Sequence, residues 1–243
     1  MSGDGADSAH GLTGIADAGA FLARLARLDP GALVRLRRAA PGWTALWARL
    51  PWGVLVGRTV DGAGPGDATV SAAALLAELS AGGARLPARR DVEWRHPLPP
   101  SPGRMVEAVP AATVRRLAAA AAGTLRTAAV EGVGGRAVGE RTLRDALLDH
   151  VAIVVTEPVQ GESEGLPARV EVPQRLVQAV IRMGFLGPDP GRGQGETAAS
   201  NSLETVQVRL VGQWVGLSAP YGVAWLRNVG QLALTPALSP PNG

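Results

Sequence analysis

Apolar residues recur at helical spacing in the first part of the chain. A helix is predicted to begin near Asp17, whose carboxylate can cap it, and to end at Asp29 and Pro30. Its apolar positions are Phe21, Leu22, Leu25 and Leu28. The same spacing predicts a short second helix containing Leu33, Val34 and Leu36, and a third helix with Trp43, Leu46, Trp47 and Leu50 along one face.

Runs of β-branched residues separated by turn-forming residues follow these helices. The first half continues with strands over 52–60 and 68–70, a loop at 61–67 and a helix over 72–80. The second half is predicted to contain a long helix from Pro110, a helix over 140–150, strands over 151–156 and 169–172, and a helix over 173–183. Gly184 stands where a left-handed helix cap belongs. Strands near 204–211, 213–218 and 222–227 form a terminal antiparallel hairpin.

The order of these elements indicates a duplication. Residues 43–80 and 141–183 each run helix, strand, loop, short strand, helix, and chance repetition of a common order is the alternative. We predict an α+β fold with two similar helix–strand–strand–helix halves and a C-terminal antiparallel hairpin. The predicted segments are a disordered leader (1–16), an N-terminal half (17–96), a Pro-rich linker (97–105), a C-terminal half (106–235) with a disordered loop (187–202), and a disordered tail (236–243).

The composition removes most of the groups that catalysis uses. All 24 basic residues are arginine, cysteine is absent, and the three histidines are scattered. The chain therefore has no thiol nucleophile, no Schiff-base lysine and no zinc cluster with recognisable spacing. Neither G-x-G-x-x-G after a strand nor a Walker-type loop occurs. We predict no catalytic residue, no cofactor and no bound metal, and an enzyme is the least supported class.

Charge is distributed unevenly although the net charge is only +3. Residues 17–60 carry seven arginines against two acids, and residues 131–171 carry eight acids against four arginines. This polarity serves either a partner or the attraction of the two halves for each other.

The segment 89–95 (RRDVEWR) combines arginine and tryptophan, the composition of binding hot spots. As a strand it would place Arg90, Val92 and Trp94 on one face. One interpretation is a protein-binding surface made by Arg89, Arg90, Trp94 and Arg95. The other is a surface strand whose charges pair with each other and whose tryptophan covers the core.

The helix over 173–183 offers a nucleic-acid interpretation. Gln174, Arg175, Gln178 and Arg182 occupy its non-core positions, and such side chains read base edges. A preceding helix and the following hairpin at 204–227 give a winged-helix-like order, to which the basic residues Arg35, Arg37 and Arg38 would add. A solvated amphipathic helix over a sheet is the alternative.

The tryptophans complete the sequence-based expectations. Trp43 and Trp47 are expected in the core, and Trp214 and Trp225 are expected to pair across the terminal hairpin. No membrane span or secretory signal is visible, so the cytoplasm is the expected compartment. The first functional hypothesis is a non-catalytic interaction protein that binds another protein through its Arg/Trp surface, and the alternative is a nucleic-acid-binding module. The pattern does not set the partner's identity or the oligomeric state.

Overall fold

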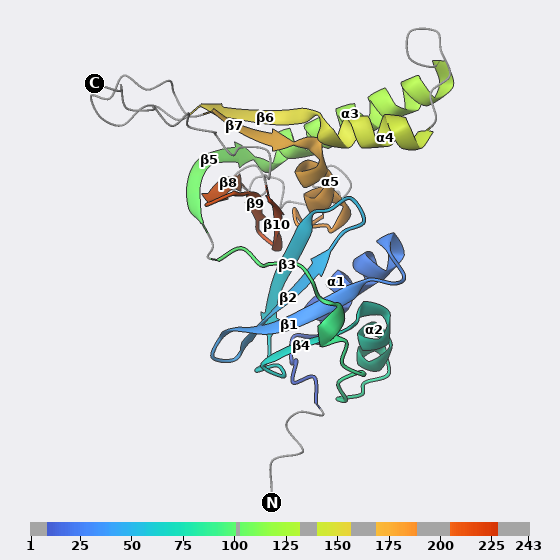
Figure 1. Ribbon diagram of the computed structural model, residues 1–243, viewed down its shortest axis with the longest axis vertical. Helices are drawn as coiled ribbons and strands as arrows, with labels where there is room; N and C mark the ends of the chain where they lie inside the picture. Colours follow the sequence, from blue (N-terminus) through green and yellow to red (C-terminus); the bar gives the residue numbers. More distant parts are fainter. Residues whose placement is uncertain (1–8, 101–102, 132–139, 157–168, 189–204, 228–243) are drawn as a thin grey trace, which may run out of the picture.

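The computed structural model describes residues 9–100, 103–131, 140–156, 169–188 and 205–227 (Figure 1). Its helices are α1 (Ile15–Leu28), α2 (Ala72–Ser80), α3 (Ala111–Glu131), α4 (Glu140–Asp149) and α5 (Gln174–Arg182), with a 3-10 turn η1 (Asp91–Glu93). Its strands are β1 (Leu33–Ala40), β2 (Trp43–Arg49), β3 (Leu55–Asp61), β4 (Asp67–Ser71), β5 (Arg104–Pro110), β6 (Val151–Thr156), β7 (Arg169–Pro173), β8 (Thr205–Val211), β9 (Trp214–Ala219) and β10 (Gly222–Arg227).

One eight-stranded antiparallel sheet runs through both halves of the chain, in the order β4-β1-β2-β3-β10-β9-β8-β5. The two halves meet where β3 pairs with β10, through Val223 opposite Gly57, Ala224 opposite Val56 and Trp225 opposite Leu55. On either side of this junction the order is the same. A helix and a three-stranded meander (α1-β1-β2-β3 or α5-β8-β9-β10) are flanked by one further strand, β4 or β5.

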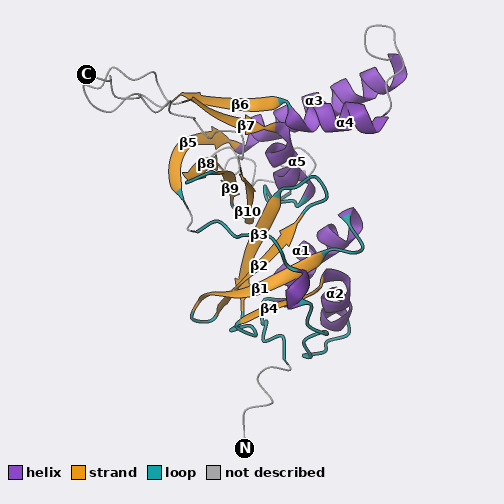
Figure 2. Cartoon of the chain, in the orientation of Figure 1, coloured by secondary structure: helices purple, strands orange, loops and turns teal. Residues whose placement is uncertain are grey.

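Helices cover one face of this sheet, as Figure 2 shows for α1 and α2 in the first half and α5 in the second. We call this the inner face. Burial alternates along β2, where Thr44, Leu46 and Ala48 are buried beneath the helices and the residues between them are not. Such alternation is the mark of an antiparallel sheet with one side packed on a core.

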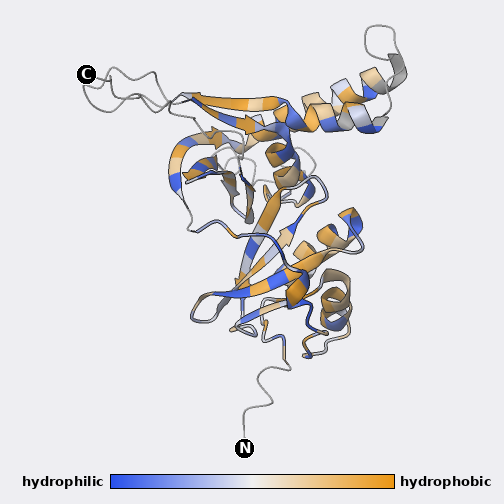
Figure 3. Cartoon of the chain, viewed as in Figure 1, coloured by the Kyte–Doolittle hydropathy of each residue, from blue (hydrophilic) through white to orange (hydrophobic). Residues whose placement is uncertain are grey.

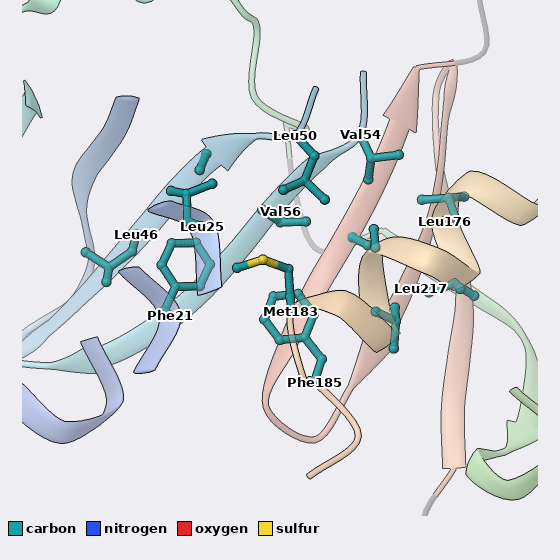
Figure 4. Packing of buried hydrophobic residues seen from close by; sticks show 14 of the residues in the cluster. Phe21, Leu25, Leu46, Leu50, Val54, Val56, Leu176, Met183, Phe185 and Leu217 are labelled. Carbon is teal, nitrogen blue, oxygen red and sulfur yellow. The ribbon is translucent and has the colours of Figure 1, made fainter. Parts of the chain in front are cut away.

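The core crosses the junction of the two halves (Figure 4). Phe21 of α1 stacks on Phe185, which follows α5, with ring centroids 6.4 Å apart. Gly184 has a φ of 66°, so the predicted left-handed cap is confirmed, and this turn brings Phe185 into the core. The buried residues form one continuous cluster from α2 to β8.

A two-stranded ribbon, β6–β7, lies against α5 beside the main sheet. Figure 3 shows β6 as almost uniformly hydrophobic. Val155, Val170 and Val172 are buried, whereas Arg169 and Glu171 form an ion pair of 3.0 Å on the other side. Among the described helices, none is both long enough and apolar enough to cross a membrane.

The α+β class, the helices predicted near 17–28, 72–80, 140–150 and 173–183, and the three terminal strands are confirmed. The first helix begins at Ile15, so Asp17 lies in its first turn and does not cap it. Two predicted helices are wrong: residues 33–40 form β1 and residues 43–49 form β2. The first half therefore does not read helix–strand–strand–helix over 43–80. The division into domains stays a prediction, because the sheet joins the proposed halves.

Three smaller expectations also need correction. Residues 9–16 are not a disordered leader, because His10 and Leu12 are buried and Ala9 bridges to Arg85. Trp43 is 45% exposed rather than in the core. Trp225 does not pair with Trp214, because the register places it opposite Gly216. The loop predicted to be disordered lies almost wholly outside the described residues, as does the predicted tail.

Candidate protein-interaction site

The side of the main sheet that faces away from the helices, here called the outer face, gathers tryptophan and arginine side chains. The register places Arg35 of β1 opposite Trp47 of β2 and Arg37 opposite Ala45, all on this face. Further along the sheet, Leu55, Trp225, Gly216 and Arg209 stand opposite one another in sequence from β3 to β8. The outer face therefore carries the residue types that dominate protein-binding hot spots.

Two tryptophans lie flat across this face because glycines stand beside them. A Cβ atom on Gly57 would come within 2.8 Å of the Trp47 ring, and one on Gly216 within 2.4 Å of the Trp225 ring. Trp225 is buried, whereas Trp47 is half-buried.

Residues 94–100 form an extended segment that leaves η1 and runs in front of the sheet, and Gly103 stands directly before β5 (Figure 1). The Arg35 guanidinium lies 6.0 Å from the centre of the Trp94 ring. Arg209 Nη1 donates to the Gly103 carbonyl at 2.8 Å, and the Gly103 backbone lies against Trp225. Residues of the outer face thus contact both Trp94, where the extended segment begins, and Gly103, directly before β5.

Arg35 is held by a carboxylate beneath the Trp94 ring. Its Nε and Nη2 donate to the two oxygens of Asp67, both at 2.7 Å, and Arg37 adds an ion pair at 3.6 Å. The hydrogen bonds from Arg35 hold the pKa of Asp67 below its usual value, and Asp67 in turn raises the pKa of Arg35. This network orients a guanidinium for a cation–π contact rather than for chemistry.

The predicted cluster at 89–95 is not a strand but the turn η1 and its flanks. Its charges pair locally, Arg89 with Asp91 at 2.7 Å and Arg90 with Glu93 at 2.5 Å. The turn also closes the free edge of β4, where Thr69 N donates to Asp91 and Arg90 N donates to the Thr69 carbonyl. A binding role for these two arginines stays a prediction, and their observed contacts are structural.

Val92 is the most exposed apolar residue of the segment 89–95, with 84% of its surface accessible to solvent, and Arg95 is also exposed. Trp94 is half-buried. Its Nε1 donates to the His96 carbonyl at 2.7 Å, and its ring meets the His96 ring edge-on. Trp94 and Arg95 therefore remain accessible beside the outer face.

Trp43 was not recognised from the sequence as a site residue. It stands at the start of β2, where the β1–β2 hairpin turns, and Arg37 and Arg38 are exposed in the same hairpin. The hairpin at 37–43 thus presents an indole and two guanidinium groups to solvent. Period-2 alternation with Thr44, Leu46 and Ala48 was the signal that could have placed Trp43 outside.

The residues of the nucleic-acid hypothesis are not brought together. Gln174 is only 4% exposed, which contradicts its expected place on an exposed helix face. Arg175 Nη1 donates to the Trp52 carbonyl at 3.1 Å, and its Nη2 pairs with Asp149. Gln178 is half-buried, and only Arg182 of this helix set is exposed. Arg35 and Arg37 lie on the opposite side of the sheet from α5.

Helices α1, α3 and α5 are rich in arginine. Their arginines are Arg24 and Arg27 of α1, Arg115, Arg116 and Arg126 of α3, and Arg175 and Arg182 of α5, of which Arg175 pairs with Asp149. In the described side chains of these three helices the single acid is Asp17, which pairs with Arg58 at 2.5 Å.

A pocket of about 210 Å³ opens beside Trp94. The turn after α1, the turn after β2 and the start of the extended segment line it, with Asp29, Arg49, Glu93, Trp94 and His96 as its polar and aromatic side chains. Burial, and then the Arg49 charge, lower the pKa of His96. Among the described residues, no group of three or more histidine and carboxylate side chains is arranged to hold a metal ion.

Solved structures with a similar fold are bacterial sliding clamps. A putative DNA polymerase III beta subunit from Eubacterium rectale matches with a TM-score of 0.51 and 8% identity, over 89% of this chain and 63% of that one. A DnaN sliding clamp from Pseudomonas aeruginosa, bound to griselimycin, matches with a TM-score of 0.50 and 11% identity, over 97% of this chain and 69% of that one. The beta subunit of DNA polymerase from Streptococcus pyogenes matches with a TM-score of 0.49 and 12% identity, over 88% of this chain and 62% of that one.

This chain thus spans less than two thirds of several of these clamp subunits, and the likeness concerns the fold. No curated protein matches the sequence.

Two family models match successive parts of the chain. Residues 11–96 match a domain of unknown function, DUF8010, and residues 98–231 match a domain of unknown function, DUF8185. The second match covers more than half of the sequence, and the chain therefore belongs to the DUF8185 family.

Proposed function

We propose that this chain is a non-catalytic protein-interaction module of sliding-clamp-like fold, and that a protein partner docks on the outer face at the hairpin 37–43. The observation that carries the proposal is Trp43, a large side chain left 45% exposed in the same hairpin and on the same face as the exposed Arg37. Exposed tryptophan beside arginine is the composition of residues that dominate protein interfaces. The clamp-like fold supports an assembly role, since the similar structures are subunits of a DNA polymerase.

The arrangement of these side chains supports a binding module better than it supports an enzyme. Each carboxylate near the Arg/Trp network is hydrogen-bonded to an arginine: Asp67 to Arg35, Asp91 to Arg89 and Glu93 to Arg90. Groups held in this way position side chains and do not carry the shifted acid and base pairs of general acid–base catalysis.

Affinity purification from the source cells, followed by binding of the purified partner, tests the proposal. The variants Trp43→Ala and Arg37→Ala should each weaken that binding by about tenfold or more, because a hot-spot truncation costs on the order of 1.4 kcal/mol or more. Met105→Ala is the matched control, since Met105 is an exposed apolar residue of the same face in the other half. A partner that binds Trp43→Ala as tightly as the unaltered protein contradicts the proposal.

Nucleic-acid binding is a second candidate, favoured by the arginines of α1, α3 and α5. It predicts a complex with mixed-sequence DNA or RNA that weakens steeply with salt, because each phosphate contact releases a counterion. Replacing Arg27, Arg116, Arg126 and Arg182 by glutamine should abolish the complex, whereas replacing Arg37 and Arg95 on the other side should not. Equal loss in both variants would show that the effect follows net charge and not this surface.

A further inference from the structure

The pocket beside Trp94 differs from the rest of the outer face because its arginine is not already paired. Arg49 lines it from the end of β2 and has no hydrogen-bond or ion-pair partner among the described residues. The imidazole nitrogens of His96 likewise have none there, since its contacts are the edge of the Trp94 ring at 5.8 Å and the bond to its main-chain carbonyl. Two nitrogen-bearing groups with hydrogen-bonding capacity to spare therefore meet in one pocket.

The carboxylates of the pocket are already used. Both oxygens of Glu93 accept from Arg90, at 2.6 and 2.5 Å. Asp29 Oδ1 accepts from Gly31 N at 2.9 Å, within its own turn. The groups of the pocket that lack a hydrogen-bond partner are thus mainly donors, and such groups favour a ligand that accepts hydrogen bonds.

We propose that this pocket binds the carboxylate of an aspartate or glutamate side chain of the partner protein, with Arg49 and His96 as donors and the Trp94 ring as an apolar wall. The inference rests on the proposed function, because the pocket adjoins the outer face through Trp94. A guanidinium takes a carboxylate in a bidentate manner, and an aromatic face covers the methylene groups of such a side chain. The pocket volume of about 210 Å³ is large enough for a carboxylate and its methylene groups.

The binding of a carboxylate at this site is coupled to protonation of His96. The imidazole faces Arg49 from the β2–β3 turn, Asp29 from the α1–β1 turn and Glu93 from η1. Ordinary carboxyl and guanidinium groups keep their charge between pH 8 and 5, so His96 is the group that titrates there. A bound carboxylate offsets the repulsion between the imidazolium and Arg49. The affinity for the carboxylate therefore rises as the pH falls.

The chain offers a direct measurement, because it contains only three histidines. Proton NMR resolves their ring resonances, and His96→Gln assigns one of them. The probe is the peptide acetyl-Gly-Glu-Gly-amide, and the same peptide with glutamine is its neutral control. The glutamate peptide should shift the His96 resonance and raise the pKa of His96 by about one unit, which makes binding up to about tenfold tighter at pH 5 than at pH 8.

Arg49→Gln should remove this shift, whereas Arg182→Gln, an exposed arginine at the end of α5 that does not line the pocket, should leave it unchanged. The inference is overturned if the glutamine peptide binds equally, if His10 or His150 responds in place of His96, or if His96 does not respond at tens of millimolar peptide. A response to inorganic phosphate without one to the glutamate peptide also overturns the carboxylate assignment. None of these outcomes depends on Trp43, so the pocket and the docking surface fail or stand separately.

Discussion

Glycine at position 57 gives the Trp47 indole its place on the outer face. A methyl group there would lie 2.8 Å from ring atoms Cε3 and Cζ3 of Trp47, closer than carbon atoms approach without displacement. The ring is half-buried and packs on Gly57 of the neighbouring strand β3, so its displacement disturbs the packing on that strand.

We therefore expect Gly57→Ala to lower the free energy of unfolding by about 1 to 3 kcal/mol, the usual cost of overpacking. Urea denaturation followed by tryptophan fluorescence measures the change. Gly19→Ala is the control, because Gly19 lies within α1 with no atom within 4 Å of an added Cβ. That substitution should raise stability by about 0.5 to 1 kcal/mol through helix propensity. Equal effects of the two substitutions would contradict the close packing of Trp47.

The ion pair between Arg35 and Asp67 should be visible as a dependence of stability on acid. The pKa of Asp67 is lower in the folded protein than its ordinary value of 3.8, so folding favours the charged carboxylate. This contribution is complete above pH 3.8 and is lost as the pH falls through the lower, folded-state value. Asp67→Asn should lower stability near neutral pH by at most about 1 kcal/mol, since Asp67 is partly exposed and its pairs are screened by solvent.

The difference between Asp67→Asn and the unaltered protein should narrow below about pH 3.8, where the unaltered carboxyl becomes protonated as well. Urea midpoints measured between pH 2.5 and 7 check this behaviour. Asp145→Asn removes one exposed carboxylate of α4 and is the control for the general effect of losing a surface charge. A constant difference between the two proteins down to the lowest pH would mean that Arg35 does not hold this carboxylate.

Elements whose apolar residues fit only one spacing, that of a helix or that of a strand, were predicted. Elements whose apolar residues fit both spacings were not. In residues 43–50 the set Trp43, Leu46, Trp47 and Leu50 fits a helix, while the set Thr44, Leu46, Ala48 and Leu50 fits a strand. The sheet decides, because β1 and β3 pair with β2 on both sides. Tryptophan and threonine also prefer strands. A single sequence does not show these neighbours, so the strand was missed and Trp43 was placed in the core.

The candidate site was predictable only where it depends on local composition. The Arg/Trp content of 89–95 is local, and it singled out Trp94, which lines the pocket; a binding role for Trp94 stays a prediction. Arg49 and His96 lie 47 positions apart in the sequence and meet only because the extended segment returns across the β2–β3 turn. The buried place of Gln174 has a similar cause, since α3 covers the side of α5 that was expected to face solvent.

Helix α5 is fastened to the first half of the chain by its second residue. Trp52 Nε1 donates to the Arg175 carbonyl at 3.2 Å, and Arg175 Nη1 donates to the Trp52 carbonyl at 3.1 Å. Arg175→Ala removes the donor to the Trp52 carbonyl and the partner of Asp149, so we expect a loss of about 1 to 2 kcal/mol in the free energy of unfolding.

Arg182→Ala is the matched control for Arg175→Ala, since Arg182 lies on the same helix and is exposed. Its effect should stay within about 0.5 kcal/mol. Thermal denaturation of both variants gives the comparison. If Arg182→Ala costs more than Arg175→Ala, α5 presents its first turn to solvent, as a recognition helix would.

At the scale of the whole molecule, the two halves share one sheet and one core. Three residue pairs join β3 to β10, and Phe21 and Phe185 stack across the same junction (Figure 4). Arg58 of β3 adds a cation–π contact with Tyr221 in the turn before β10, at 5.7 Å. A half that separated would expose Phe21 or Phe185 and leave the edge of β3 or β10 unpaired, which is costly in water.

This arrangement predicts that the halves unfold together. Phe185→Ala should destabilise the protein by about 3 to 5 kcal/mol, because it removes a large buried ring and leaves a cavity. Hydrogen exchange should then accelerate by a similar factor in β1–β2 and in β8–β9, although Phe185 belongs to the second half. Val154→Ala, at an exposed position of β6, should leave both regions protected. Protection that persists in β1–β2 while β8–β9 exchanges freely would mean that the junction is a contact between two independent domains, because a shared core transmits the loss to every strand that it supports.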